Sequence, residues 1–193
     1  KIAKTVRSNG VLIAQVTPRG GMISGQSSIT HLDGWNWEDA ALRADDGIHL
    51  NWPSSFHQSG WWAEPGTINE NEKYNENIAQ LKIFFKKANS YANSYGLMDL
   101  QMESMKGLFN GSKTLYIHAN NTSDMLDAID FANAVKITKP NIEGAEDALK
   151  IVDVLKENNI SLILNRVHRL PSSGDSPVDE PFMQAAKLQE AGI

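Results

Sequence analysis

The stretch from Leu115 to Leu164 decides the fold and reads LYIHANNTSDMLDAIDFANAVKITKPNIEGAEDALKIVDVLKENNISLIL. It holds three short apolar runs, at residues 115–119, 135–138 and 161–164, and each is typical of a buried strand. Apolar residues recur at helical spacing in the two segments between these runs. Because strands and helices alternate, right-handed crossovers predict a parallel sheet covered on both faces, either open or closed as a barrel.

The rest of the chain extends this pattern in both directions. Residues 11–16, VLIAQV, form another apolar run that predicts a strand. Two further helical stripes lie before the strand at residue 115: Ile78, Leu81, Phe85, Ala88 and Ala92, then Met98, Met102, Met105 and Phe109. The first ten residues and residues 182–193 resemble helices that lack their neighbouring strands. We therefore expect residues 1–193 to form a single domain that is part of a larger α/β barrel.

Residues 18–71 differ from the rest because they show little periodicity and many glycines. We interpret this segment as a long insertion after the first visible strand. Its tryptophans are expected to pack in one cluster, since buried large rings would keep an irregular segment ordered. They are Trp35, Trp37, Trp52, Trp61 and Trp62.

The same segment supports a rival function. Acidic side chains accompany the tryptophans, and aromatic rings beside paired carboxylates are typical of a sugar-binding cleft. A structural aromatic cluster with a solvated acidic rim accounts for the same composition. These acidic residues are Asp33, Glu38, Asp39, Asp45 and Asp46. The rival to an enzyme is therefore a carbohydrate- or peptide-binding α/β module.

Composition excludes several classes of site and partner. The chain has no cysteine, so disulfides, thiolate metal sites and a cysteine nucleophile are excluded. A formal net charge of −5 gives no reason to expect nucleic acid as a partner. No apolar run approaches the roughly 20 residues that a membrane helix needs. The sequence assigns no cellular compartment.

Four residues are candidates for a site. His118 ends an apolar strand, where sites of parallel α/β proteins are built and where a neutral imidazole suits a metal ion. It can equally be a histidine packed against the start of a helix. His168 and Arg166 follow the run 161–164, and a loop role is the alternative for both. Arg19, in a glycine-rich loop after residues 11–16, suits an anionic group, although the glycines can simply serve a tight turn.

Several segments resemble imidazolonepropionase-related bacterial amidohydrolases. Residues 9–25, NGVLIAQVTPRGGMISG, resemble the region of the second barrel strand of that family. Residues 32–40 and 47–53, LDGWNWEDA and GIHLNWP, resemble the insertion that follows it. Residues 115–120 resemble the fifth strand, and residues 166–171 resemble the segment after the seventh. The likeness spans nearly the whole chain.

The resemblance implies a TIM-like (β/α)8 barrel, here in part, that uses a divalent metal, usually zinc, to hydrolyse amide or cyclic amide C–N bonds of a small-molecule or peptide-like substrate. It implies that His118 is a metal ligand. It also implies that a histidine pair lies before Lys1 and an aspartate after Ile193, and residues 135–140 contain no histidine. With His118 as the one ligand assigned, we expect this chain by itself to be inactive, to bind metal weakly or not at all, and to self-associate through open strand edges.

Overall fold

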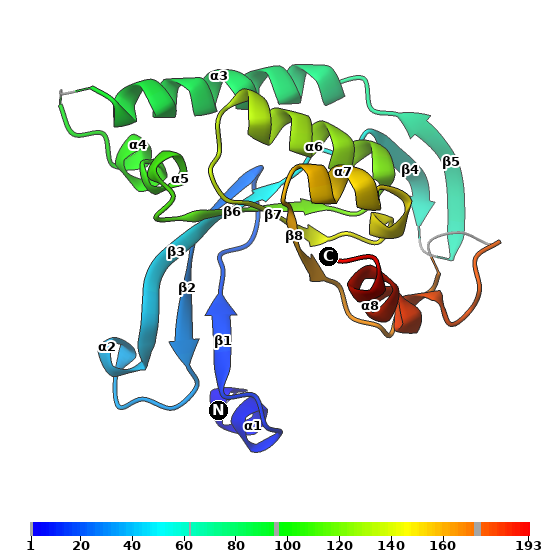
Figure 1. Ribbon diagram of the computed structural model, residues 1–193, viewed down its shortest axis with the longest axis horizontal. Coiled ribbons are helices and arrows are strands. Elements are labelled where there is room, and N and C mark those ends of the chain that lie inside the picture. The colour runs from blue at the N-terminus through cyan, green and yellow to red at the C-terminus, as the bar shows by residue number, and fades with distance from the viewer. Residues whose placement is uncertain (1, 62, 95–96, 172–174) are drawn as a thin grey trace.

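A six-stranded sheet forms the centre of the computed structural model, which describes residues 2–61, 63–94, 97–171 and 175–193. The strand order is β1-β2-β3-β6-β7-β8. β3, β6, β7 and β8 are parallel, whereas β1 and β2 extend the sheet with antiparallel pairing. The sheet curls like part of a barrel (Figure 1). The strands are β1 (Ile13–Val16), β2 (Ile23–His31), β3 (Ala41–Asn51), β6 (Thr114–Ala119), β7 (Pro140–Gly144) and β8 (Ser161–Leu164).

Helices cover one face of the parallel strands. α3 (Tyr74–Ala92), α6 (Thr122–Ala134) and α7 (Val152–Glu157) lie along the upper side of the sheet in Figure 1. Alternate strand residues point toward them and form a buried apolar core with Phe85 and Phe131; these strand residues are Ile48, Leu50, Leu115, Ile117 and Ile142. Because side chains alternate along a strand, the intervening residues of β3, β6 and β7 face the opposite side. That side carries polar groups.

The remaining elements are short or peripheral. β4 (Phe56–Trp61) and β5 (Glu64–Glu70) form a separate hairpin, and 3₁₀ helix η1 precedes α7. No described helix is both long and apolar enough to cross a bilayer. The other helical elements are α1 (Ile2–Ser8), α2 (Trp37–Ala40), α4 (Leu100–Met105), α5 (Gly107–Asn110), η1 (Ala148–Lys150) and α8 (Glu180–Glu190).

The predicted strand at residues 135–138 is wrong. Val135 ends α6, and Lys136 has a positive φ of 60° that directs the chain away from the helix. The strand begins at Pro140 instead. An apolar run was misleading here because β7 is polar on one face and apolar on the other. Its central Ile142 enters the core, whereas Glu143 next to it does not.

The predicted tryptophan cluster is also wrong. Trp52 is buried, but Trp35, Trp37 and Trp61 have exposed fractions of 96%, 74% and 55%, and Trp62 lies outside the described residues. The segment is ordered by backbone pairing instead, since β2 pairs with β3 over most of its length and β4 pairs with β5. Strand hydrogen bonds therefore replace the aromatic core that its composition suggested.

Candidate metal centre

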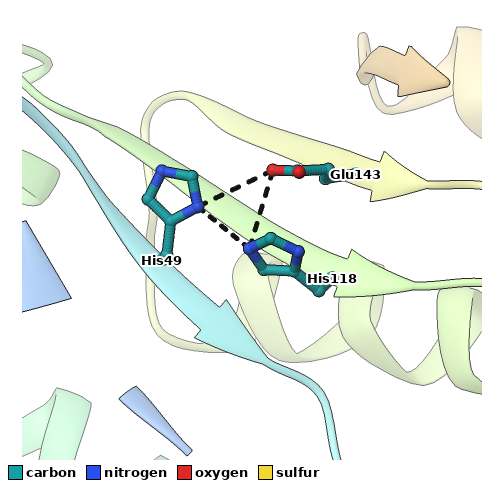
Figure 2. A group of neighbouring side chains, drawn as sticks. All are labelled: His49, His118 and Glu143. Atoms are coloured by element: carbon teal, nitrogen blue, oxygen red, sulfur yellow. Dashed lines mark hydrogen bonds and ion pairs between the residues drawn. The ribbon is translucent and has the colours of Figure 1, made fainter. Parts of the chain in front are cut away.

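Three side chains on adjacent parallel strands converge on the polar face of the sheet. They are His49 of β3, His118 of β6 and Glu143 of β7, and each presents one potential ligand atom within 4.8 Å of the others (Figure 2). The sheet register explains why they meet. His118 pairs with Glu143, and His49 lies two residues before Asn51, the partner of His118. Each residue lies at or within two residues of the carboxyl end of its strand, where α/β proteins build their sites.

The three facing atoms form an isosceles triangle. His49 Nδ1 lies 2.9 Å from His118 Nε2, and Glu143 Oε2 lies 3.6 Å from each of these nitrogens. A triangle with these sides has a circumradius of about 2.0 Å, and zinc–nitrogen and zinc–oxygen bonds are about 2.0–2.2 Å long. One point is therefore at bonding distance from all three atoms.

The environment of His49 favours the neutral imidazole, which is the form that binds metal. His49 is 1% exposed. Burial lowers its pKa, and the neighbouring His118 lowers it further, against the opposite effect of the carboxylates of Glu143 and Asp46. A neutral ring keeps a lone pair on one nitrogen, and in this orientation Nδ1 is the nitrogen that faces the other two donors.

A buried carboxylate oxygen gives the cluster its strongest requirement for a cation. Glu143 Oε2 is inaccessible to solvent and accepts no hydrogen bond from the described residues. A buried acceptor without a partner costs free energy, and a charged one costs more. A metal ion at the point equidistant from the three atoms would neutralise this oxygen. The donor set of two imidazoles and one carboxylate therefore fits a divalent ion such as zinc.

The cluster is closed on one side and open on the other. The His49 side chain is only 1% exposed, whereas those of His118 and Glu143 are 33% and 29% exposed. A small molecule would therefore approach past His118 and Glu143. His49 forms the inner wall.

The strand end that carries His118 is held in place by the segment after β3. Trp52 N–H donates to the carbonyl of His118, and Ser55 N–H donates to Asp124 Oδ1 in the first turn of α6. Asn121 caps that helix, since its side-chain oxygen accepts from the backbone N–H of Asp124.

The other predicted site residues do not join the cluster. His168 is exposed and packs edge-on against Phe182 of α8. Arg166 is exposed after β8 and lines a hollow with Glu146, Asn165 and Arg169. Arg19 is exposed in the loop between β1 and β2. No hydrogen bond, ion pair or ring contact in the described part of the chain links these three residues to the histidines.

Sequence reasoning missed two members of the cluster. Sequence reasoning assigned His118 alone as a metal ligand, whereas His49 and Glu143 also lie near the ends of parallel strands and face it. His49 was assigned to the insertion, and Glu143 followed the misplaced strand. The signal for Glu143 was present in PNIEG, where one apolar residue alternates with polar ones before a glycine, a pattern of a strand with one polar face. The signal for His49 was the pair of apolar residues on either side of it, Ile48 and Leu50, which indicates a strand with one apolar face and His49 on the other face.

Comparison with known proteins supports the fold. No family model matches the sequence, and no curated protein matches it either. A solved structure, an amidohydrolase from Thermotoga maritima MSB8, superimposes with a TM-score of 0.66 at 19% sequence identity. The chain shares an amidohydrolase fold. The match covers 95% of this chain and 57% of that protein, so the chain spans little more than half of its neighbour's length. The likeness confirms the predicted partial barrel at the level of architecture.

Proposed function

We propose that this chain carries part of the active centre of a metal-dependent amidohydrolase, with a single divalent ion, zinc, held by His49, His118 and Glu143. The observation that carries the proposal is the buried, unpartnered Oε2 of Glu143, which faces two imidazole nitrogens at 3.6 Å each. The likeness of the fold to an amidohydrolase is a second, independent support. Bound there, zinc would supply Lewis-acid chemistry, polarising a carbonyl and acidifying water for hydrolysis of a C–N bond.

Each residue has a defined part in this proposal. His49 contributes a neutral nitrogen from the inner wall, and Glu143 contributes the negative charge that favours a dication over neutral ligands. His118 contributes the second nitrogen at the accessible side. Three protein ligands with one open position is the arrangement of catalytic rather than structural zinc. The substrate would enter on that open side.

The substrate class follows from the family resemblance. We propose an amide or cyclic amide of a small or peptide-like molecule, hydrolysed by the whole barrel of an imidazolonepropionase-related enzyme. His168, Arg166 and Arg19 remain our predictions for substrate contacts, since none of them belongs to the metal cluster. The binding-module rival receives no such support. Its exposed tryptophans among the described residues lie on two hairpins, near α2 and in β4, which are far apart in Figure 1.

Elemental analysis tests the metal site directly. The chain is purified without chelator or metal-affinity resin, dialysed against limited zinc, and compared with His118→Ala and His57→Ala. His57 is an exposed histidine in β4, outside the cluster, and is the matched control. We expect stoichiometric zinc in the parent chain and in His57→Ala, and its loss in His118→Ala. Weak binding was predicted from the sequence because His118 was the one ligand assigned. Stoichiometric binding is expected now because the structure offers three ligands. Equal zinc in both variants, or none in the parent chain, would refute the proposal.

A further inference from the structure

The ring nitrogen of His49 that does not face the metal cluster, Nε2, lacks within the described part of the chain the hydrogen bond that metal-binding histidines usually make. Such a histidine normally donates its second N–H to a carboxylate or carbonyl, which fixes the ring. His49 Nε2 is buried and has no hydrogen-bond partner among the described residues. With Nδ1 directed at the metal cluster, the orientation of this ring must depend on another contact.

Tyr116 supplies a contact over the whole ring. Its aromatic ring is stacked on the imidazole of His49, with centroids 4.6 Å apart and planes inclined by 16°. The two residues are register partners on β3 and β6, so the sheet itself sets them face to face. Tyr116 is 8% exposed, and its ring therefore has little freedom to move away.

A buried carboxylate anchors the far end of Tyr116. The phenol hydroxyl donates to Asp46 Oδ2 at 3.0 Å. Asp46 is 2% exposed and also accepts from Ser27 Oγ at 2.8 Å and from Gln15 Nε2 at 2.9 Å. Donors from β1, β2 and β6 thus converge on one residue of β3, so a shift of any of these strands would disturb the anchor.

A glycine makes room for this arrangement. A Cβ at Gly47 would lie 2.4 Å from Tyr116 Cε2, 2.8 Å from its Cδ2 and 2.6 Å from the backbone oxygen of Thr114, distances that real atoms do not adopt. The backbone of Gly47 is not in the left-handed region, so the glycine is required by the close approach of β6, through the tyrosine ring and the Thr114 carbonyl, and not by its own backbone conformation. The ring can lie over β3 beside His49 only because position 47 has no side chain.

We propose that Tyr116 is a positioning residue for His49, anchored by Asp46 and admitted by Gly47, and that it replaces the missing hydrogen bond at Nε2. The inference rests on the proposed metal centre. A metal ion withdraws electron density from the imidazole that binds it, and an electron-rich neighbouring ring then stacks more favourably. The Asp46 carboxylate enriches the phenol through its hydrogen bond. Tyr116 therefore holds the ring in place and favours its metal-bound form.

Metal affinity of three variants tests this role. Zinc affinity is measured by competition with a chromophoric chelator, and the geometry of the site is read from the visible absorption spectrum of the cobalt-loaded chain. We expect Tyr116→Leu to bind zinc about 10–100-fold more weakly, the loss typical of a supporting residue. Gly47→Ala should weaken binding at least as much with Tyr116 still present, because the new methyl group displaces the ring and also presses against the Thr114 carbonyl. Tyr116→Phe should keep most of the affinity, because the stack remains.

Tyr74→Phe is the matched control. It also removes a tyrosine hydroxyl that donates to an aspartate, Asp127, at 2.6 Å, but this bond lies among the helices rather than at the metal cluster. It should leave zinc affinity and the cobalt spectrum unchanged, so a shift confined to the variants at 116 and 47 supports positioning.

The two proposals fail in different ways. If the chain without substitutions binds neither zinc nor cobalt, the proposed metal centre is wrong and this inference fails with it. Parent-like affinity and spectrum in both Tyr116→Leu and Gly47→Ala overturn the positioning role alone. If Tyr116→Leu does not fold, Gly47→Ala and Tyr116→Phe decide the question between them.

Discussion

Replacement of Glu143 by glutamine is expected to change stability in opposite directions with and without metal. The variant exchanges a buried, unpartnered carboxylate oxygen for an amide. The new NH₂ group can donate to whichever of His49 Nδ1 and His118 Nε2 is the acceptor in their mutual hydrogen bond, since both lie 3.6 Å from the present oxygen. An unsatisfied buried acceptor costs about 1–3 kcal/mol. We therefore expect the metal-free variant to gain about 1 kcal/mol in free energy of unfolding, at the low end of that range.

The size of the effect in a melting experiment follows from the chain length. At about 2.1 cal/mol/K per residue, 193 residues have an unfolding entropy of about 0.4 kcal/mol/K. A gain of about 1 kcal/mol then raises Tm by about 2–3 °C. Zinc at about 100 times its Kd adds about 2.7 kcal/mol, so it should raise the Tm of the parent chain by about 6–7 °C. That rise should vanish in Glu143→Gln.

The assay is thermal unfolding followed by circular dichroism, in chelator and again in zinc. Glu146→Gln is the control, because this carboxylate is similarly exposed but already interacts with Asn165 and Arg169. It should lose a little stability without metal and keep the zinc-induced rise. A metal-free Glu143→Gln chain that melts below the parent chain, or one that retains the zinc-induced rise, would refute the reasoning from the unpartnered oxygen.

Three further predictions concern the scaffold around the site, each measured as the free energy of unfolding in urea. Phe131→Ala should lose about 3–5 kcal/mol, because this fully buried ring packs edge-on against two other aromatic rings, whereas Ile83→Ala on the exposed side of α3 should lose far less. Tyr74→Phe should lose about 1.5–3 kcal/mol, the usual contribution of a hydrogen bond to a charged group such as Asp127, and a loss below 0.5 kcal/mol would contradict that assignment. Asn121→Ala should lose about 1 kcal/mol by removing the cap of α6, and Asn121→Ser should recover most of it.

Local patterns in the sequence were sufficient for the longer helices and for two strands of the parallel sheet. The stripe from Ile78 to Ala92 lies in α3, and the apolar runs beginning at Leu115 and Ser161 are β6 and β8. α3 and β6 bury a stripe or run of apolar residues, and that burial follows directly from the spacing of these residues, whereas β8 has the apolar run but is only partly buried. The position of His118 at a strand end followed from the same pattern.

The same rule failed where a strand has one polar face. The run 135–138 is apolar because it closes α6 against the core, and Val135 and Ile137 are both buried there without being part of a strand. β7 has a single core residue, Ile142, and its neighbours Asn141 and Glu143 face the polar side of the sheet. β2 is rich in serine, and its stability comes from pairing with β3 over a long hairpin.

The sequence by itself determined the α/β class, the helix positions and the place of His118 at the end of a strand, because each of these depends on residues within one turn or one strand. Only the tertiary structure decided that His49, His118 and Glu143 share a site. His49 and His118 are 69 residues apart, and their contact depends on the register of β3 against β6, while that of Glu143 depends on β7 against β6. Register is a property of strand pairs, and a shift of one residue would turn each of these side chains to the other face of the sheet.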